Sequence, residues 1–324
     1  MSSEQAVRTI GVDLGGTKVE TALVNADGEI ISSIRHPTDA KKGAASVIEA
    51  IAASARKYLN DGDNAPKALG IGVAGQVDTS SGLVRFAPNL FWNNVPLGQE
   101  LERTLGIPVA VVNDVWAASW GEFSHGAGQD VDDLVCLFVG TGIGGGIVVH
   151  GRLIEGATSS AGELGHTTVV AGGRKCHCPN SGCLEAYVGG WAIAERAREA
   201  VTRDPKAGAG LLSIAGKVEE IVGFTVAEAF QSGDPLASAI IQETGEYLAA
   251  GIVSIVNGLN PSVLVLGGGI IEGIPKLVEI VGPIVRQRSL PPAVERLRIS
   301  RAALANQAGV IGAAALGRNK LKAL

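Results

Sequence analysis

Residues 9–24 read TIGVDLGGTKVETALV, and this stretch decides the fold that we expect. Two apolar runs flank Gly15 and Gly16, which predicts a strand, a tight turn and a second strand, with a third strand to follow at 29–35. Because the element after the two glycines is a strand and not a helix, the turn matches neither the P-loop nor the dinucleotide-binding fingerprint. The chain is therefore expected to open with a β-meander.

A second glycine-rich stretch repeats this arrangement. Residues 134–149 read LVCLFVGTGIGGGIVV, again a strand, a turn and a strand, so we expect a duplicated α/β architecture. The small domain is placed at 1–115, with a C-terminal helix at about 306–324 packing back on it, and the large domain at 116–305. Further strands are expected at 68–75, 109–114 and 262–269, and helices at about 43–59, 97–105, 191–203 and 234–258.

The composition bounds the class of protein. The chain has 324 residues, which exceeds what one hydrophobic core usually serves. Its formal net charge of −5 disfavours a nucleic-acid binder, because affinity for phosphates needs clustered Lys and Arg. The polar start MSSEQAVRT lacks a signal-peptide pattern, and no run of about 18 apolar residues is present. We therefore expect a two-domain cytoplasmic protein without a membrane or nucleic-acid partner.

The glycine-rich turns are candidate phosphate-binding loops. In GVDLGGTK the strand delivers Asp13 to its end, the glycines let backbone N–H groups close on an anion, and the following Thr and Lys add donors. Thr141 offers a hydroxyl in the second turn, and a third glycine cluster at 267–269 stands before a helix. Each turn alone is also explained as an ordinary glycine turn. Together they predict a nucleotide site with the residues Asp13, Gly15, Gly16, Thr17, Lys18, Thr141, Gly142, Gly268 and Gly269.

A carboxylate stands at the end of a predicted strand. The sequence VAVVND at 109–114 ends with Asn113 and Asp114 and leads into a predicted helix. Both side chains are then expected at the carboxyl edge of a sheet, where α/β clefts form. A carboxylate there suits a general base that accepts a proton from a hydroxyl. The alternative interpretation of Asp114 is a helix N-cap, which Asp commonly provides.

Cysteine and histidine residues gather in one short stretch. His166, Cys176, Cys178 and Cys183 offer one imidazole and three sulfurs, and structural Zn²⁺ sites take four such ligands. The alternatives are free buried thiols or redox thiols, although Cys-x-Cys is too tight for an easy internal disulfide. His177 is less suited as a ligand, because adjacent residues do not readily converge on one ion. With four ligands used, the metal is expected to shape a loop and not to catalyse hydrolysis.

The order of these motifs resembles one known family. Over essentially its whole length the chain is similar to the ROK family of bacterial sugar kinases and repressors, most of all to the glucokinase branch. Departures from the usual pattern are Ala74, where many glucokinases have Pro, and His177 and Pro179, where residues are commonly small or Gly. The likeness rests on GVDLGGTK (11–18), GVAGQVD (72–78), APNL (87–90), ND (113–114), GTGIGGG (140–146), ELGH (163–166) and CHCPNSGCLE (176–185).

The resemblance implies a fold, an activity and a site. The fold is that of an actin-like ATPase, with two α/β domains of ribonuclease H-like topology around a cleft. The activity is transfer of a phosphoryl group from ATP, with Mg²⁺, to a hexose, first of all glucose, with Asp114 as the catalytic base and structural Zn²⁺ on the Cys and His cluster. The implied sugar contacts, two of them acids flanking the Cys-rich loop, are Gly75, Asn89, Asn113, Asp114, Glu163, His166 and Glu185.

Several alternatives stay open at this point. The acceptor is glucose or else N-acetylglucosamine, N-acetylmannosamine, fructose or mannose, and some relatives accept polyphosphate as well as ATP. The family also includes sugar-responsive repressors, but a first strand at Thr9 leaves no room for an N-terminal helix-turn-helix. A catalytically silent sugar sensor is disfavoured because Asp13, Lys18, Asn113 and Asp114 are all present. The resemblance implies a homodimer, with a tetramer as the alternative.

Overall fold

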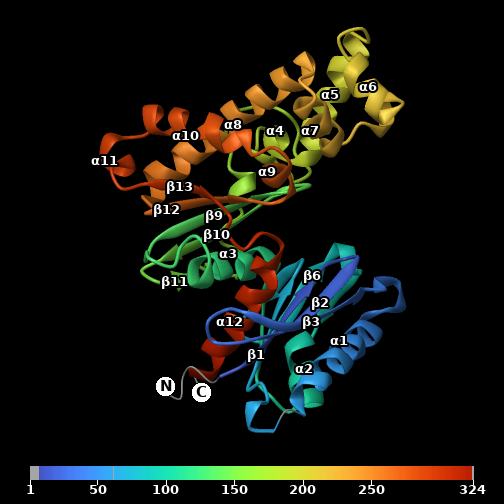
Figure 1. Ribbon diagram of the computed structural model, residues 1–324, viewed down its shortest axis with the longest axis vertical. Coiled ribbons are helices and arrows are strands. Elements are labelled where there is room, and N and C mark those ends of the chain that lie inside the picture. The colour runs from blue at the N-terminus through green and yellow to red at the C-terminus, as the bar shows by residue number, and fades with distance from the viewer. Residues whose placement is uncertain (1–6, 61, 323–324) are drawn as a thin grey trace. The chain divides into compact units, whose positions relative to one another are not determined.

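The computed structural model describes residues 7–60 and 62–322. Contacts between residues divide the chain into two compact units. Unit 1 consists of the described residues of 1–132, 146–161 and 303–324, and unit 2 of residues 133–145 and 162–302. The elements of both units are labelled in Figure 1.

The helices and strands have the following bounds. The α-helices are α1 (Ala44–Leu59), α2 (Leu97–Leu105), α3 (Asp114–His125), α4 (Glu185–Val188), α5 (Gly190–Arg203), α6 (Ala209–Ala215), α7 (Gly223–Gln231), α8 (Pro235–Leu259), α9 (Gly269–Gly273), α10 (Lys276–Arg288), α11 (Pro291–Val294) and α12 (Ala308–Lys322). The strands are β1 (Thr9–Leu14), β2 (Lys18–Val24), β3 (Ile30–Pro37), β4 (Leu69–Val73), β5 (Gln76–Asp78), β6 (Leu83–Ala87), β7 (Trp92–Val95), β8 (Val109–Asn113), β9 (Leu134–Val139), β10 (Ile143–Val149), β11 (Arg152–Leu153), β12 (Val263–Gly267) and β13 (Arg298–Arg301).

Unit 1 is built on a five-stranded sheet with the order β3-β2-β1-β4-β8. β1 pairs antiparallel with β2 and parallel with β4, and β8 pairs parallel with β4. The turn between β2 and β3 is closed by the Oδ1 atom of Asn25, which accepts hydrogen bonds from the N–H groups of Asp27 (3.0 Å) and Glu29 (2.9 Å). The expected meander of three strands is therefore present.

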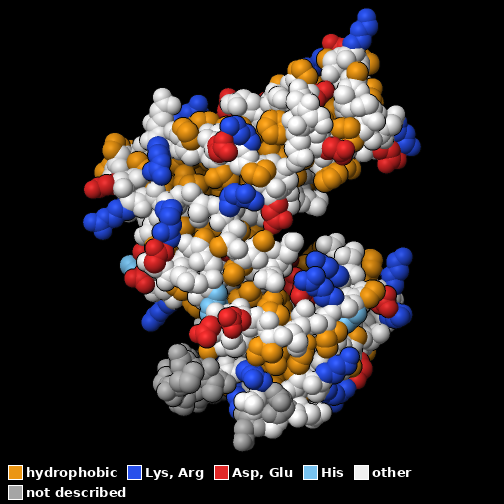
Figure 2. All heavy atoms as spheres, in the orientation of Figure 1, with side chains coloured by type: hydrophobic (Ala, Val, Ile, Leu, Met, Phe, Trp, Pro, Cys, Tyr) orange, Lys and Arg blue, Asp and Glu red, His pale blue; other side chains and the backbone are white. Residues whose placement is uncertain are grey.

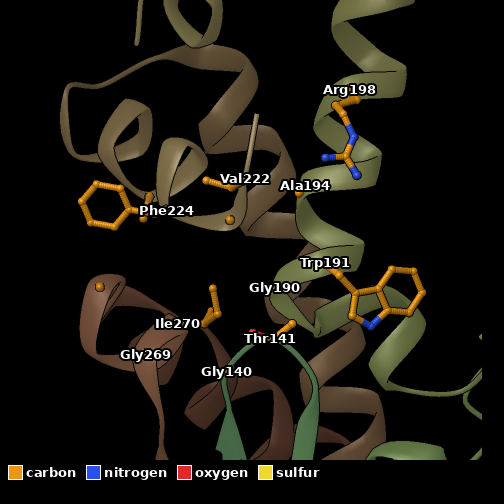
Figure 3. Close-up of a pocket in the computed structure, with 13 residues that line it drawn as sticks. Gly140, Thr141, Gly190, Trp191, Ala194, Arg198, Val222, Phe224, Gly269 and Ile270 are labelled. Carbon is orange, nitrogen blue, oxygen red and sulfur yellow. The ribbon is translucent and has the colours of Figure 1, made fainter. Parts of the chain in front are cut away.

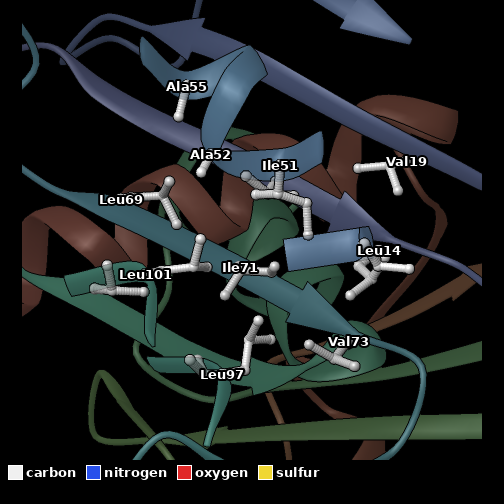
Figure 4. Close-up of a cluster of buried hydrophobic side chains, with 14 of the residues drawn as sticks. Leu14, Val19, Ile51, Ala52, Ala55, Leu69, Ile71, Val73, Leu97 and Leu101 are labelled. Atoms are coloured by element: carbon white, nitrogen blue, oxygen red, sulfur yellow. The ribbon is translucent and has the colours of Figure 1, made fainter. Parts of the chain in front are cut away.

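One face of this sheet carries the core of unit 1. Figure 4 shows Leu14, Leu69 and Ile71 of the strands packed with Ile51 of α1 and Leu101 of α2. All five side chains are 0% exposed. Burying a side chain of this size contributes about 1.5–3 kcal/mol, so this cluster holds α1 and α2 to the sheet.

The opposite face of the sheet is covered by α3 and α12, which also pack against each other. A Cβ atom on Gly70 would lie 1.8 Å from the carbonyl oxygen of Ala313, and one on Gly11 would lie 2.0 Å from that of Val310. The missing side chains let the backbone of α12 lie directly on β1 and β4. This is the helix expected at about 306–324, of which residues 323–324 lie outside the described residues.

The second five-stranded sheet has the order β11-β10-β9-β12-β13. β12 pairs parallel with β9 and with β13, and β10 pairs antiparallel with β11. Numbered along the chain, the strands of this sheet follow the same spatial order as those of the first. The duplication expected from the two glycine-rich stretches is therefore observed, and the class is α/β. In unit 2, α8 packs against α4, α5, α7 and α10.

Among the parts of the fold that were not expected from the sequence are a small sheet and two helices. β5, β6 and β7 form a small antiparallel sheet, whose strands of three to five residues are too short for an alternating pattern to stand out. In unit 2, α6 and α7 occupy the interval between α5 and α8, the two long helices that the apolar periodicity predicts.

The two units differ in their bounds from the expected domains 1–115 and 116–305. α3 belongs to unit 1 because it packs on α12, and residues 146–161 join it there. A Cβ on Gly146 would stand 2.0 Å from the Oγ atom of Ser119 on α3, and the indole N–H of Trp116 donates to the carbonyl oxygen of Ala161 (3.1 Å). Packing onto α3, and not order along the chain, sets these bounds.

The surface mixes charges of both signs. On the face shown in Figure 2, Lys and Arg side chains lie interspersed with Asp and Glu side chains, in keeping with the modest formal net charge of −5. Within residues 7–60 and 62–322, none of the helices combines the length and the apolar character that a membrane crossing requires.

Candidate functional site

Two carboxylates stand at the carboxyl edge of the first sheet. Asp13 lies in β1 opposite Gly72 of β4, and β8 on the other side of β4 ends with Asn113 opposite Val73. Asp114 follows as the first residue of α3. It is thus a helical residue, where the sequence suggested the end of the strand. Parallel strands bring both acids to one edge of the sheet, as expected for a ligand site of an α/β fold.

The environment favours the protonated form of both acids. Burial, followed by the charge of Asp114, raises the pKa of Asp13 from 3.8 to about 6, and the nearby Lys18 opposes this shift. Burial also raises the pKa of Asp114, against a hydrogen bond from the N–H of Val115 (3.0 Å). Carboxyl groups with such raised pKa values are candidates for general acid–base chemistry.

Asn113, and not Asp114, is the N-cap of α3. Its Oδ1 atom accepts hydrogen bonds from the N–H groups of Val115 (2.9 Å) and Trp116 (3.2 Å). Its Nδ2 atom donates to the carbonyl oxygen of Gly75 (3.1 Å). The structure thereby brings together Gly75, Asn113 and Asp114, which the family resemblance had assigned to one sugar site.

The first glycine turn is held from both sides. The N–H of Gly15 donates to the carbonyl oxygen of Lys18 (3.0 Å), and the hydroxyl of Thr38 donates to that of Gly15 (2.6 Å). The N–H of Gly15 is therefore used within the turn and is not available to a phosphate, contrary to what the sequence suggested. A Cβ on Gly16 would lie 2.7 Å from the Cβ of Asn89, so this turn adjoins the segment of a predicted sugar contact.

A pocket of about 450 Å³ opens beside this turn in unit 1. Gly16, Thr17 and Asn89 line it together with Lys41 and Lys42 of the segment after β3. The ammonium group of Lys42 pairs with the carboxylate of Asp39 (2.6 Å). The expected phosphate-binding turn and the expected sugar contact Asn89 thus border one cavity.

A larger pocket, of about 660 Å³, lies entirely within unit 2 (Figure 3). Thr141 and Gly269, both predicted nucleotide contacts, line this pocket. Gly142 and Gly268 lie next to these lining residues in the chain. The remaining wall comes from α5, from α7 with the residue before it, and from the rest of α9, none of which the sequence singled out as part of a pocket. The apolar members of that wall are Ala194, Val222, Phe224, Ala227 and Ile270.

Phe224 is the clearest signal that sequence reasoning missed. The residue is 74% exposed, although large apolar side chains in helices of globular proteins normally face a core. In the structure it lies at the mouth of the unit 2 pocket across from α5 (Figure 3). An exposed aromatic ring at a concave site is typical of a surface that stacks on a flat ligand.

Glu185 braces the second glycine-rich turn. It is 9% exposed, and its Oε2 atom accepts a hydrogen bond from the N–H of Ile143 (2.8 Å). Its Oε1 atom accepts from the indole N–H of Trp191 (3.4 Å). A Cβ on Gly142 would lie 2.4 Å from Oε2, so glycine is required there for the carboxylate to reach the turn.

The predicted ligands of the Cys-rich loop converge. The ligand atoms of His166, Cys176, Cys178 and Cys183 all lie within 4.8 Å of one another. Two isolated bridges, Thr168 with Cys183 and Lys175 with Ser181, fold the loop back on itself. His177 is not a member of the converging group, as expected from its place between two ligands.

The spacing of these atoms fits a tetrahedral ion. A zinc ion that binds sulfur at about 2.3 Å places two thiolates about 3.8 Å apart, and the Sγ atoms of Cys178 and Cys183 are 3.5 Å apart. The Nδ1 atom of His166 lies 3.7 Å from the Sγ atom of Cys176. Burial raises the pKa of Cys183 to about 12, so a thiolate at this position requires a cation beside it.

The predicted sugar contacts are divided between the two units. Glu163, His166 and Glu185 belong to unit 2, and the others belong to unit 1. In unit 2, the Nε2 atom of His166 lies 4.0 Å from the Oε2 atom of Glu163. Nδ1 therefore faces the thiols, and Nε2 faces the acid that precedes the loop.

Comparisons with known proteins agree on one family. The sequence model of the ROK family matches residues 9–320. The glucokinase of Thermotoga maritima is 34% identical over 97% of this chain and 98% of its own length. A ROK family glucokinase from Streptomyces griseus, solved with glucose and AMPPNP, is 35% identical over 96% of this chain and 99% of that chain, with a TM-score of 0.80.

Relatives with other functions match over a similar share of the chain. An N-acetylmannosamine kinase of Escherichia fergusonii is 30% identical over 96% of this chain and 99% of its own length. A xylose repressor of Caldicellulosiruptor bescii is 31% identical over 95% of this chain and 77% of its own length. The solved relatives confirm the expected α/β fold of the actin-like ATPase class.

Proposed function

The chain belongs to the ROK family, and we propose that it is an ATP-dependent hexose kinase with glucose as its preferred acceptor. Glucokinases at 33–34% identity over nearly the whole chain support this proposal. The reaction yields a sugar 6-phosphate and ADP.

The position of Asp114 carries the proposal. Asn113 caps α3, so Asp114 is not needed as the cap and stands beside Asp13 at the carboxyl edge of the sheet with a raised pKa. As the sugar oxygen forms its bond to the γ-phosphorus, the carboxylate of Asp114 takes the hydroxyl proton. The bond from the γ-phosphorus to the bridging oxygen breaks, and ADP leaves with the electron pair. Mg²⁺ enters with ATP and offsets the charge of the phosphates.

The unit 2 pocket is proposed to receive the nucleoside part of ATP. Val222, Phe224 and Ile270 offer apolar surfaces for a flat base, and Thr141 offers a hydroxyl to a phosphate. Lys18, beside Asp13 in unit 1, is proposed to bind the phosphates together with the first glycine turn, through N–H groups other than that of Gly15. Since the phosphate contacts of Lys18 and the first glycine turn do not distinguish ATP from a phosphate chain, polyphosphate is a second donor to test.

Zinc is proposed to brace the sugar-binding loop. His166 and the three cysteines form a closed set of four ligands that leaves no open position, which is typical of a structural site. With Nδ1 on the metal, the N–H at Nε2 of His166 is directed away from the thiols and can orient a sugar hydroxyl together with Glu163. Metal removal is then expected to weaken sugar binding.

The alternatives differ in acceptor or in class. An N-acetylhexosamine, mannose or fructose as acceptor would use the same base and the same nucleotide pocket. A sugar-responsive regulator would have no use for the buried acid pair Asp13 and Asp114, whose ionised forms are destabilised. A cytoplasmic location and a homodimer complete the proposal, by analogy with the family.

A substrate panel tests the proposal. ADP formation is measured by a coupled assay with glucose, mannose, fructose, N-acetylglucosamine and N-acetylmannosamine, with Asp114→Asn as the control of low activity. The expected result is the highest kcat/KM with glucose and a sugar-dependent rate of the control that is lower by on the order of 10² or more. Negligible turnover of every hexose defeats the kinase proposal, and sugar-dependent binding to duplex DNA would favour a regulator. Replacing ATP by polyphosphate in the same assay tests the donor.

A further inference from the structure

The Cys-rich loop touches the nucleotide side of unit 2 through a residue that is not a ligand. His177 stands between Cys176 and Cys178 but outside the converging group. Its imidazole stacks on the indole of Trp191, with ring centroids 4.0 Å apart and an angle of 23° between the planes. This stack joins the Cys-rich loop to the beginning of α5.

Trp191 is placed at the pocket by its backbone. Its N–H donates to the carbonyl oxygen of Thr141 (3.2 Å), and the N–H of Gly190 donates to that of Gly140 (2.9 Å). Both bonds hold the first turn of α5 against the glycine-rich turn at 140–146. Trp191 also lines the pocket, but Figure 3 shows its indole turned away from Val222 and Phe224. The ring therefore serves the contact with His177.

Glu185 closes this chain of contacts. It follows Cys183, a predicted metal ligand, by two residues. Its Oε1 atom accepts a hydrogen bond from the indole N–H of Trp191 (3.4 Å), and its Oε2 atom accepts one from the N–H of Ile143 (2.8 Å). Since Ile143 belongs to the glycine-rich turn, the carboxylate connects the end of the Cys-rich loop to that turn. Three side chains, those of His177, Trp191 and Glu185, thus connect the Cys-rich loop with the start of α5 and with the turn at 140–146.

We propose that these contacts make zinc binding and nucleotide binding mutually dependent. Zinc orders the loop, the stack of His177 on Trp191 transmits that order to α5, and Glu185 transmits it to the turn at 140–146. The proposal rests on the proposed function, since it needs zinc in the loop and a nucleotide in the pocket. His177 and Trp191 act here as positioning residues.

The effect is expected in binding constants. If zinc orders contacts that the nucleotide needs, zinc and nucleotide raise each other's affinity by the same factor, and such factors are commonly about 5–150-fold. A protein whose turn is already ordered loses less conformational entropy when the nucleotide binds. We expect a factor of about tenfold here.

Calorimetric titration with ADP tests the proposal on the full chain. ADP is used because it binds without turnover. Wild-type protein is titrated zinc-loaded and after removal of zinc by a chelator that is then washed out, and circular dichroism monitors its folding. The Kd for ADP is expected to rise about tenfold on zinc removal. His177→Ala is expected to keep one zinc per chain but to bind ADP about as weakly as zinc-free wild-type protein, with a zinc dependence of about twofold or less.

Two further variants separate the links. Trp191→Phe keeps an aromatic ring for His177 but loses the N–H that reaches Glu185, and an intermediate zinc dependence is expected. Trp120→Phe is the matched control, because Trp120 lies on α3 of unit 1 and packs on Phe123 with ring centroids 5.0 Å apart. It should keep the wild-type zinc dependence. In turnover, His177→Ala should raise the KM for ATP about tenfold and leave kcat within about twofold.

The outcomes are distinguishable. Equal ADP affinity of wild-type protein with and without zinc overturns the inference, and so does a His177→Ala variant that keeps the full zinc dependence or loses its zinc. If the zinc-free protein unfolds, the zinc-loaded forms decide: an unchanged Kd for ADP in His177→Ala overturns the inference. A wild-type protein that binds no ADP in either state contradicts the proposed function instead.

Discussion

Asp13 lies near the end of β1 and Asp114 directly after β8, on the two sides of β4, and the charge of Asp114 adds to burial in raising the pKa of Asp13 to about 6. Each ionised carboxylate therefore destabilises the other. A fold that keeps two such groups together retains them for a purpose other than stability.

The first prediction concerns catalysis. Asp114→Asn removes the group that accepts the hydroxyl proton but keeps the shape of the side chain. We expect kcat to fall by on the order of 10² or more, while sugar binding largely survives. Steady-state kinetics and calorimetric sugar binding check this. Near-normal turnover would refute the assignment of the base.

The second prediction concerns stability and pH. Folding raises the pKa of both acids above 3.8, so their ionisation penalises the folded state. For Asp13, whose pKa is raised to about 6, this penalty is fully present above about pH 6 and disappears as the pH falls toward 4. Asp114→Asn removes one charge and one cause of the shift at Asp13. The variant should melt higher than wild-type protein at pH 8, by roughly 2–4 °C for each kcal/mol gained.

The difference in Tm should shrink when the same thermal scans are made at pH 5, where Asp13 of the wild-type protein takes up a proton and its charge no longer opposes that of Asp114. A variant that melts lower than wild-type protein at pH 8, or an advantage that grows at low pH, would contradict the sign of this argument.

The third prediction concerns the Cys-rich loop and its predicted zinc ion. Cys178→Ser replaces a soft thiolate by a hydroxyl, so zinc should be lost and the loop should disorder. Metal analysis of the purified protein is expected to show less than one zinc per chain, and the KM for the sugar should rise about tenfold or more. Cys136→Ser is the control, because Cys136 lies in β9 outside the converging group. Stoichiometric zinc in Cys178→Ser would count against these ligands.

The fourth prediction concerns the segment by which the chain returns to unit 1. Glu122 is 0% exposed, and its carboxylate accepts hydrogen bonds from the N–H groups of Ala127 (3.0 Å), Ala303 (2.9 Å) and Leu304 (2.8 Å). Glu122→Gln turns one acceptor into a donor that faces these N–H groups. The expected loss of stability is about 3 kcal/mol.

A lowered urea midpoint or Tm measures that loss. The matched control is Glu49→Gln, which removes only the exposed pair with Arg56 and should cost less than about 1 kcal/mol. A Glu122→Gln variant as stable as this control would show that the carboxylate does not hold the returning segment.

Much of the fold was predictable because its signals are local. The apolar runs around Gly15-Gly16 and around the turn at 140–146 marked the strands from which both sheets start, and the repeat of that pattern marked the duplication. The four side chains that converge in the Cys-rich loop were recognisable as a candidate metal site for the same reason, since they lie within one short stretch. The three-stranded sheet of β5, β6 and β7 escaped notice because each strand is too short to show a period.

The roles of neighbouring residues needed the tertiary structure. Asn and Asp are both good N-caps, so the sequence could not decide between Asn113 and Asp114. The backbone decides it: Asn113 has extended dihedral angles (φ −64°, ψ 146°) and faces the first turn of α3, while Asp114 is already helical. The same holds for Gly15, whose N–H is used inside its own turn.

By itself, the sequence determined which chemical groups are present and which short segments carry them, because turns, strand periodicity and ligand spacing depend on near neighbours. Only the tertiary structure decided which groups meet: Asp13 with Asp114 across β4, Glu185 with the turn at 140–146, and His177 with Trp191. These contacts join segments that are far apart in the chain, and their existence depends on how the side chains pack, which no local pattern records.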